Sequence, residues 1–137
     1  MTVVKVGDKI PSWEMPCVER SRMRTMAAIL RDPNPVHWDA KLVSTLPLGA
    51  GERTINQGPL GLSYMINMLH DWAGPTCVKR IFMTFPKIVL SEDFVIAKGL
   101  VTGVSSAREV TCDIWLERDG VRLLDGNATI VFSRDYD

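Results

Sequence analysis

The sequence has little that would attach it to nucleic acid or to a membrane. Its 16 Lys and Arg residues balance its 16 Asp and Glu residues, and no basic stripe runs along the chain. Nucleic acid and anionic membrane surfaces therefore gain no electrostatic attraction to it. No apolar run approaches the roughly 18 residues that a membrane-spanning helix needs. The first residues also lack the long apolar core of a signal peptide, so we expect a cytoplasmic protein.

Cysteine and histidine are also scarce. The three cysteines, Cys17, Cys77 and Cys112, are odd in number and widely scattered, which predicts neither a disulfide framework nor a zinc site. We expect three small buried side chains in a reducing compartment, and we expect no metal or other cofactor. The two histidines, His37 and His70, leave few places for imidazole chemistry.

The length and composition predict one globular domain over residues 1–137. The chain is 46% hydrophobic and 23% charged, which is ordinary for a soluble domain that is long enough to bury a core. Residues 3–10 predict an entry strand and turn, with Gly7-Asp8 as the breaker. Residues 40–57 mix Gly, Pro, Ser and Thr and predict a long loop with a helical turn near its start, and ordered loops of this length are often functional.

The middle of the chain predicts one buried helix over residues 59–72. Proline at its start and Gly74-Pro75 beyond its end are typical helix boundaries. The segment is apolar on nearly every side, which is typical of a helix buried on most faces. Its polar residues, Ser63, Asn67 and His70, recur at i, i+4 and i+7. This stripe fits a substrate channel, a subunit partner, a satisfied polar seam or a solvent-facing strip.

The second half of the chain predicts antiparallel strands. β-branched and aromatic residues alternate in four segments, at residues 78–90, 93–104, 108–118 and 121–132. Asp119-Gly120 predicts a tight hairpin, and Gly126 predicts a bulge or a close backbone approach inside one strand. Together with the apolar helix, these strands predict an α+β fold in which an antiparallel sheet wraps around a central helix.

The most informative segment reads Asp-Pro-Asn-Pro-Val-His-Trp-Asp, at residues 32–39. The preceding residues, 23–31, are good helix formers with apolar positions at helical spacing. Proline after Asp32 ends that helix. Asn34 is a favoured N-cap and the proline after it a favoured first helical residue. We therefore expect a sharp corner between two helix ends, with the carboxylate of Asp32 and the imidazole of His37 both on it.

An Asp and a His at this spacing, taken alone, describe an ordinary polar turn as well as a catalytic pair. The whole string, however, resembles the signature Asp-x-Asn-Pro-(aliphatic)-His-x-Asp of the MaoC-like, or hydratase 2, enoyl-thioester hydratases. The resemblance implies the hotdog fold and the reversible syn addition of water to a trans-2-enoyl thioester, giving the (R)-3-hydroxyacyl thioester. It also implies Asp32 and His37 as the catalytic dyad, with Asn34 orienting the loop or the water.

Gln57-Gly58-Pro59 stands where that family usually has His-Gly-Met at the start of the central helix. A helix N-terminus offers free N–H groups and a positive dipole end, and glycine allows close approach. We therefore expect the Gly58 N–H to stabilise negative charge on the thioester oxygen, with simple helix capping as the alternative. Gln57 and Ser63 are expected to line the substrate site.

The resemblance also implies the partners. The substrate would be an acyl thioester of coenzyme A or acyl carrier protein, and the chain would pair with another hotdog chain as a homodimer, heterodimer or heterotetramer. Two other functions stay open. A hotdog thioesterase generally carries its acid on the central helix, where this chain has only Asp71 at the far end. An acyl-binding subunit of a heteromeric hydratase usually lacks the dyad.

Overall fold

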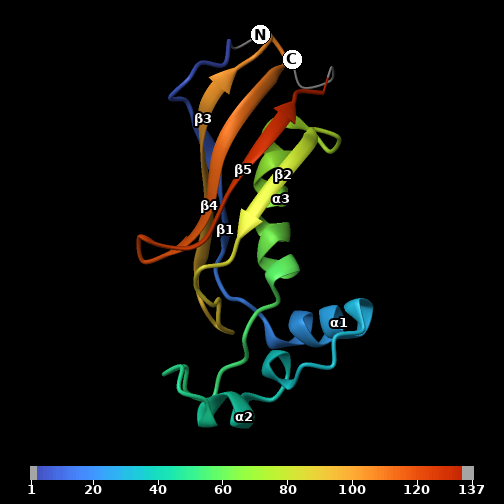
Figure 1. The fold of residues 1–137 in the computed structure, drawn as a ribbon, viewed down its shortest axis with the longest axis vertical. Coiled ribbons are helices and arrows are strands. Elements are labelled where there is room, and N and C mark those ends of the chain that lie inside the picture. The colour runs from blue at the N-terminus through green and yellow to red at the C-terminus, as the bar shows by residue number, and fades with distance from the viewer. Residues whose placement is uncertain (1–2, 134–137) are drawn as a thin grey trace.

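One antiparallel sheet packed against one long helix dominates the computed structural model, which describes residues 3–133 (Figure 1). The strands are β1 (Lys9–Met15), β2 (Val78–Thr84), β3 (Val95–Val104), β4 (Glu109–Arg118) and β5 (Val121–Val131), in the order β1-β3-β4-β5-β2. The central helix, α3 (Gly58–Ala73), lies along the sheet. This confirms the predicted α+β architecture, in which a sheet wraps around a buried helix.

The core forms between α3 and the sheet face next to it. Four α3 side chains, Tyr64, Met65, Met68 and Leu69, are almost fully buried. They belong to one cluster with side chains from every strand, among them Ile10, Val95, Ile114, Ile130 and the partly buried Ile81. Full burial of one such side chain contributes about 1.5–3 kcal/mol, so the apolar helix is the centre of the fold. Of its polar stripe, Asn67 is exposed, and Ser63 and His70 are half-buried.

The predicted hairpin turn at Asp119-Gly120 and the predicted close backbone approach at Gly126 are both confirmed. The β4–β5 hairpin turns at Asp119-Gly120, both with positive φ, 51° and 77°, as tight hairpins require. Gly126 lies inside β5 and pairs with Met83 on β2. A Cβ on Gly126 would lie 2.2 Å from the carbonyl oxygen of Phe82. Gly126 is therefore a close backbone approach, and the irregular register between β4 and β5 lies elsewhere, between Leu116 and Glu117.

Two predicted strand boundaries were wrong. The entry strand does not occupy residues 3–10 but follows the turn at Gly7 as β1, and its register shifts between Ile10 and Trp13. Pro11 falls within that irregular stretch of an edge strand, where a missing N–H is tolerated. The strand predicted over residues 78–90 ends at Thr84, because Pro86 cannot donate to a ladder.

The segment between β1 and α3 projects beyond one end of the sheet (Figure 1). It contains α1 (Arg20–Leu30), the 3₁₀ turn η1 (Pro35–His37) and α2 (Ala40–Thr45). The predicted first helix thus begins earlier than expected, and the helical turn predicted at the start of the long loop is α2. A small second core of Val43, Ala50 and Leu90 supports this projection. No helix among residues 3–133 is long and apolar enough to cross a membrane.

The cysteines are only partly as expected. Cys77 and Cys112 are buried, but Cys17 is exposed, so the expectation of three buried thiols was wrong for Cys17. Burial raises the pKa of the Cys77 thiol, and burial together with the neighbouring Cys77 raises the pKa of Cys112 to about 12.

These thiols should differ in reactivity. The thiolate is the reactive form, so at pH 8 the native protein should give one fast-reacting thiol, Cys17, with a disulfide reagent. Cys77 and Cys112 should react only after denaturation, because burial blocks access and disfavours their thiolates. The matched control is Cys17→Ser, which should abolish the fast phase. A native protein in which all three thiols react at one rate would contradict the burial described.

Candidate active site

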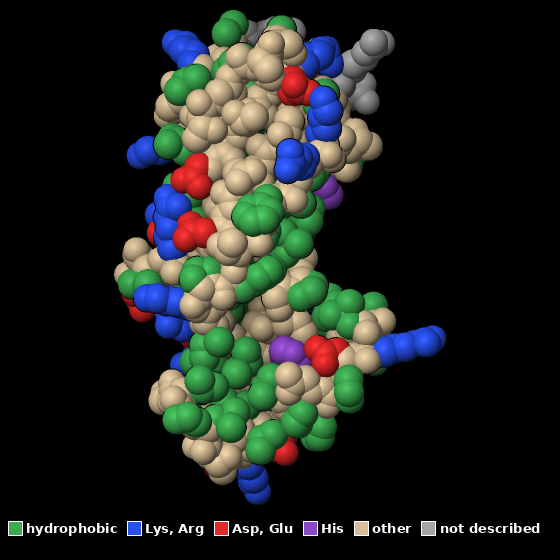
Figure 2. All heavy atoms as spheres, viewed as in Figure 1, with side chains coloured by type: hydrophobic (Ala, Val, Ile, Leu, Met, Phe, Trp, Pro, Cys, Tyr) green, Lys and Arg blue, Asp and Glu red, His purple; other side chains and the backbone are tan. Residues whose placement is uncertain are grey.

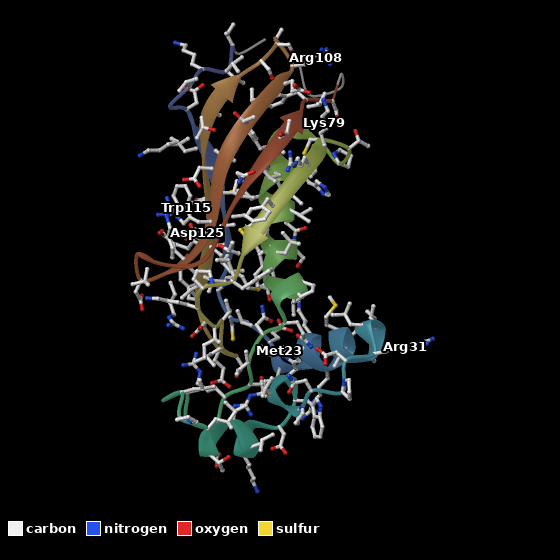
Figure 3. All side chains as sticks on the ribbon, viewed as in Figure 1. Met23, Arg31, Lys79, Arg108, Trp115 and Asp125 are labelled. Atoms are coloured by element: carbon white, nitrogen blue, oxygen red, sulfur yellow. The ribbon has the colours of Figure 1, made fainter. Side chains whose placement is uncertain are left out.

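Asp32 and His37 lie in contact at the corner between α1 and η1. The Oδ2 atom of Asp32 is 3.3 Å from Nε2 of His37. Helix α1 ends at Arg31, which adopts left-handed backbone with φ 51° and extends away from the corner (Figure 3). The N–H of Asp32 then donates to the carbonyl of Ala27 at 3.0 Å. This helix end turns the chain sharply, so that the carboxylate comes back toward the imidazole.

Asn34 organises the backbone of the corner. Its N–H donates to Oδ1 of Asp32 at 3.1 Å, and its own Oδ1 accepts the N–H of Val36 at 3.3 Å. The second bond is the predicted N-cap, which here starts a 3₁₀ turn. Because the side-chain oxygen of Asn34 is bound within the loop, its geometry fits a loop-organising role rather than direct contact with water.

The hydrogen bond on the other side of the His37 ring fixes its tautomer. Nδ1 lies 2.7 Å from the carbonyl oxygen of Ile55, and a carbonyl can only accept. Nδ1 therefore carries the proton, and in the neutral ring Nε2 keeps a lone pair that faces Asp32. Such a lone pair next to a carboxylate is favourable only when the two groups hold a proton or a water between them.

The strip Thr54–Asn56 connects this pair to the start of α3. The N–H of Ile55 donates to Val36 at 2.8 Å, which fixes the strip against η1. On its other side, the N–H of Asn56 donates to Val89 at 2.7 Å, and the N–H of Ser91 donates to Thr54 at 2.8 Å. The strip is therefore hydrogen-bonded on both sides. Because His37 is bonded to the Ile55 carbonyl, the position of the strip also fixes the position of the imidazole.

A cavity of about 120 Å³ opens at the N-terminus of α3. Residues 55–58 form one wall, and Phe85, Ile88, Val89 and Leu124 are among those of the others. Gly58 is the first residue of α3, so its N–H has no partner within the helix. A Cβ on Gly58 would lie 3.0 Å from the Phe85 ring, so a larger residue here would have to displace that ring.

Four of the predicted site residues, Asp32, Asn34, His37 and Ser63, lie outside the cavity wall. Asp32 and His37 do not line the cavity. His37 is hydrogen-bonded to the carbonyl of Ile55, however, and Ile55 is one of the residues that line it. Figure 2 shows the molecule hollowed between the body and the projecting part, where a histidine lies beside an acidic side chain. Ser63 also lies outside the wall, and its hydroxyl donates to the carbonyl of Leu60 at 2.5 Å.

Gln57 lines the cavity and also anchors α1. Its side chain is 2% exposed, and Nε2 donates to the carbonyl of Met23 at 2.7 Å. Figure 3 shows Met23 at the junction between α1 and the segment that leads into α3. The Oε1 atom of Gln57 has no hydrogen-bond partner among the described residues. Gln57 therefore holds the projecting part against the helix start and leaves one acceptor unused.

Solved structures share this architecture, although no family model and no curated protein matches the chain. The (R)-hydratase of A. caviae involved in PHA biosynthesis is 23% identical, with a TM-score of 0.82 over 95% of this chain and 98% of that one. A MaoC-like dehydratase from Rhodospirillum rubrum is 21% identical, with a TM-score of 0.74 over 96% and 94%. The ChsH1-ChsH2 complex from Mycobacterium tuberculosis is 18% identical, with a TM-score of 0.79 over 95% and 99%.

The chain has the hotdog fold of the MaoC-like dehydratases. At these identities the likeness establishes the fold and the path of the chain. Among residues 3–133, no three His, Cys, Asp or Glu side chains lie together as metal ligands would.

Sequence reasoning missed Asn56 and Tyr64. Asn56 is 7% exposed and Tyr64 is 2% exposed. Apart from each other, the Asn56 amide and the Tyr64 hydroxyl have no hydrogen-bond partner in the described chain. Burial raises the pKa of the Tyr64 hydroxyl, and the nearby Asn56 amide offsets part of that rise. The sequence carried one signal for these residues, two successive amides directly before an apolar helix.

A buried carboxylate, Asp93, clamps the strip to the hotdog sheet. Asp93 is 5% exposed, and it pairs with Arg53, just before the strip, and with Arg118 at the end of β4. Its Oδ2 also accepts the N–H of Leu90 at 2.9 Å. Nε of Arg53 donates to the carbonyl of Ser91 at 2.8 Å. These bonds join the long loop, the β2–β3 connection and the sheet at one point.

Neutralising this clamp should destabilise the protein. Asp93→Asn keeps the shape but removes the charge that two guanidinium groups share. The free energy of unfolding should fall by about 2 kcal/mol, because charge-assisted bonds contribute about 1.5–3 kcal/mol and a charge left without its partner is costly. Urea unfolding followed by tryptophan fluorescence measures this.

The adjacent carboxylate provides the control. Glu92 forms an exposed ion pair with Arg20 at 3.2 Å, so Glu92→Gln should cost less than about 1 kcal/mol. Equal losses for the two variants would show that Asp93 is an ordinary surface charge.

Proposed function

We propose that the chain is a hydro-lyase of the MaoC-like family, which reversibly adds water to a trans-2-enoyl thioester to give the (R)-3-hydroxyacyl thioester. The observation that carries the proposal is the Asp32–His37 contact, at 3.3 Å, tied through Ile55 to the N-terminus of α3. It supplies a coupled proton acceptor next to a site for developing negative charge, and water addition needs both. The hydratase and dehydratase neighbours of the same fold support it.

The proposed reaction begins with a water held by Asp32 and His37 over C3 of the substrate. Nε2 of His37 is free to accept because Nδ1 is bound to Ile55. As the oxygen–C3 bond forms, the dyad takes one proton from the water, and the electrons of the double bond move onto the thioester oxygen. The dyad then returns the proton to C2 on the same face, which restores the thioester. General acid–base catalysis of this kind contributes about 10²–10⁴-fold.

Gly58 is assigned to the thioester oxygen. Gly58 is the first residue of α3 and lines the cavity. The positive end of the helix dipole favours the enolate-like charge at that point. One donor of this type contributes about 10²–10³-fold. The acyl carrier is coenzyme A or acyl carrier protein, and we place the reaction in the cytoplasm, where the exposed Cys17 thiol would stay reduced.

Asp32→Asn and His37→Ala should each lower kcat for hydration of a trans-2-enoyl thioester by at least about 10²-fold, because either change removes the coupled proton acceptor. The thermal midpoint should change little, since neither side chain belongs to the main core. Loss of absorbance of the conjugated enoyl thioester measures the rate. The matched controls are Asp71→Asn and His70→Ala, both near the far end of α3. Wild-type turnover in either dyad variant would refute the assignment.

A hotdog thioesterase is less well supported. The carboxylate of α3, Asp71, is exposed near the C-terminal end. It lies about 20 Å along the axis from Gly58 at 1.5 Å per residue. The Asp71→Asn control therefore also tests this reading. Release of free thiol that depends on Asp71, rather than formation of 3-hydroxyacyl product, would identify a thioesterase. The alternative of a non-catalytic acyl-binding subunit is disfavoured by the contact between Asp32 and His37.

We also infer that the chain works as a pair of hotdogs, either with its own copy or with a related chain. Strand β2 is an edge of the sheet, and an unpaired edge is a template for another strand. Phe82 on β2 and Phe85 just beyond it are 55% and 50% exposed, and Phe85 also lines the cavity. The ChsH1-ChsH2 neighbour is itself a complex of two chains.

Phe82→Glu should separate the proposed pair, because a charge at this edge opposes burial against a second sheet. Light scattering on the purified chain should give twice the mass of 15.3 kDa for a homodimer and a single mass for the variant. For a heteromer, the purified chain is monomeric and gains mass only with its partner. The control is Val104→Glu, an exposed residue at the end of β3, which should leave the pair intact. A monomeric chain with full hydratase activity would contradict the inference.

A further inference from the structure

The backbone segment of residues 54–57 bonds to helix α1 as well as to His37. The hydroxyl of Thr54 donates to the sulfur of Met23 at 3.1 Å, and Nε2 of Gln57 donates to the carbonyl of Met23 at 2.7 Å. Between these two residues, a carbonyl of the same segment lies 2.7 Å from Nδ1 of His37. One short segment therefore holds both the imidazole and the helix that leads to the carboxylate of the dyad.

Helix α1 is anchored in its first half. Met23 is its buried side chain, with no exposed surface, and Met26 packs partly buried against the main core. The last two residues of the helix, Ile29 and Leu30, are 69% and 44% exposed. Figure 3 shows Met23 near the body of the molecule and Arg31 at the far end of α1. The direction of the helix is therefore set near Met23.

The position of Asp32 depends on that direction. Asp32 lies about 13 Å from Met23 along the axis, at 1.5 Å per residue, and its N–H bond to the carbonyl of Ala27 ties it to the helix. A tilt of α1 by about 10° around Met23 would move Asp32 by about 2 Å over this length. Such a shift is large enough to break the 3.3 Å contact with His37.

We propose that Gln57 is a positioning residue for the dyad: its bond to Met23 sets the direction of α1 and thereby keeps Asp32 beside the imidazole. The proposal rests on the proposed function for the reaction in which the dyad acts. Gln57 is 2% exposed, and a hydrogen bond shielded from water is stronger than one in solvent. Its donor group is used by Met23, which favours this role over contact with the substrate.

Gln57→Met removes the donor and keeps the length of the side chain. It should lower kcat for hydration by at least about tenfold with little change in KM, because misplacing a reacting group by about 1 Å can cost about 10²-fold. A raised KM with an unchanged kcat would overturn the proposal, in favour of contact between Gln57 and the substrate. The matched control is Ile114→Val, a small loss in the main core, which should leave both constants unchanged.

Gln57→His tests whether the donor itself matters. A histidine ring also carries an N–H donor, at a similar distance from the backbone, so this variant should retain most of the wild-type kcat. Equal losses in Gln57→His and Gln57→Met would exclude the bond to Met23 as the cause. If Gln57→Met does not fold, Gln57→Asn, in which the amide is one carbon shorter, takes its place.

A double-mutant cycle shows whether Gln57 acts through Asp32. In the Asp32→Asn background, Gln57→Met should have no further effect on kcat, because the carboxylate that Gln57 positions is already gone. A general structural role would instead multiply the two losses. An undiminished effect of Gln57→Met in that background would therefore contradict the proposal.

NMR of the histidine rings tests the same contact without any reaction. The chain has two histidines, His37 and His70, and His37→Ala identifies the signal of His37. Asp32→Asn should shift that signal in the wild-type protein, because Oδ2 of Asp32 lies 3.3 Å from the ring. In the Gln57→Met protein this shift should fall to less than about half. A shift of the wild-type size would show that Gln57 does not maintain the contact.

The two readouts separate this proposal from the proposed function. A shift that depends on Gln57, in a chain that hydrates no enoyl thioester alone or with its partner chain, would support the positioning role and overturn the hydro-lyase. Hydration with a kcat that Gln57→Met leaves unchanged would keep the hydro-lyase and overturn the positioning role.

Discussion

The hydrogen bond from His37 Nδ1 to the carbonyl of Ile55 is the contact on which the candidate site depends. It fixes the ring tautomer, and it joins a corner formed early in the chain to the residue that leads into α3. Together with the bond from the Ile55 N–H to the carbonyl of Val36, it holds the Asp32–His37 pair against the strip. The proton acceptor is thereby bonded to the backbone segment, residues 55–58, that leads into the N-terminus of α3.

The strip Thr54–Asn56 is held against the sheet by the ion pairs of Asp93 with Arg53 and Arg118 rather than by a large apolar contact. The second core is small, with Val43, Ala50 and Leu90 as its buried members. The Asp93 clamp therefore supplies much of what keeps the strip against the sheet. A charge-assisted bond has a narrower geometry than an apolar contact, which suits a strip that must position a catalytic ring. The candidate site is thus held by ion pairs and hydrogen bonds, whereas the sheet and α3 beside it are held by an apolar core.

Near the start of α3, Oε1 of Gln57 has no hydrogen-bond partner among the described residues, and the Asn56 amide lies beside the buried Tyr64 hydroxyl. Buried polar atoms without a full set of hydrogen bonds lower the free energy of unfolding, and they are found mainly at functional sites. Around them the hotdog core is well packed, through Tyr64, Met65 and Leu124. The buried side-chain atoms without a further partner in the described chain belong to Asn56 and Gln57 just before α3, to Tyr64 on α3 and to Arg20 at the start of α1.

Local patterns were enough to predict much of this protein. Gly58-Pro59 and Gly74-Pro75 bounded the buried helix, Asp119-Gly120 set the hairpin, and the cap at Asn34 formed as expected. Errors arose where distant residues decide. A sequence pattern does not show that Pro11 falls in an irregular edge strand, or that Cys17 stays exposed.

By itself, the sequence determined the kind of site: an acid and an imidazole on a proline-bounded corner, a glycine at a helix start, and a sheet around an apolar helix. These follow from propensities and spacings within a few residues. Only the tertiary structure decided that Ile55 fixes the ring, that Asp93 clamps the strip, and that Asn56 is buried beside Tyr64. Each of these depends on segments far apart in the chain, and their meeting is set by packing of the whole core rather than by local preference.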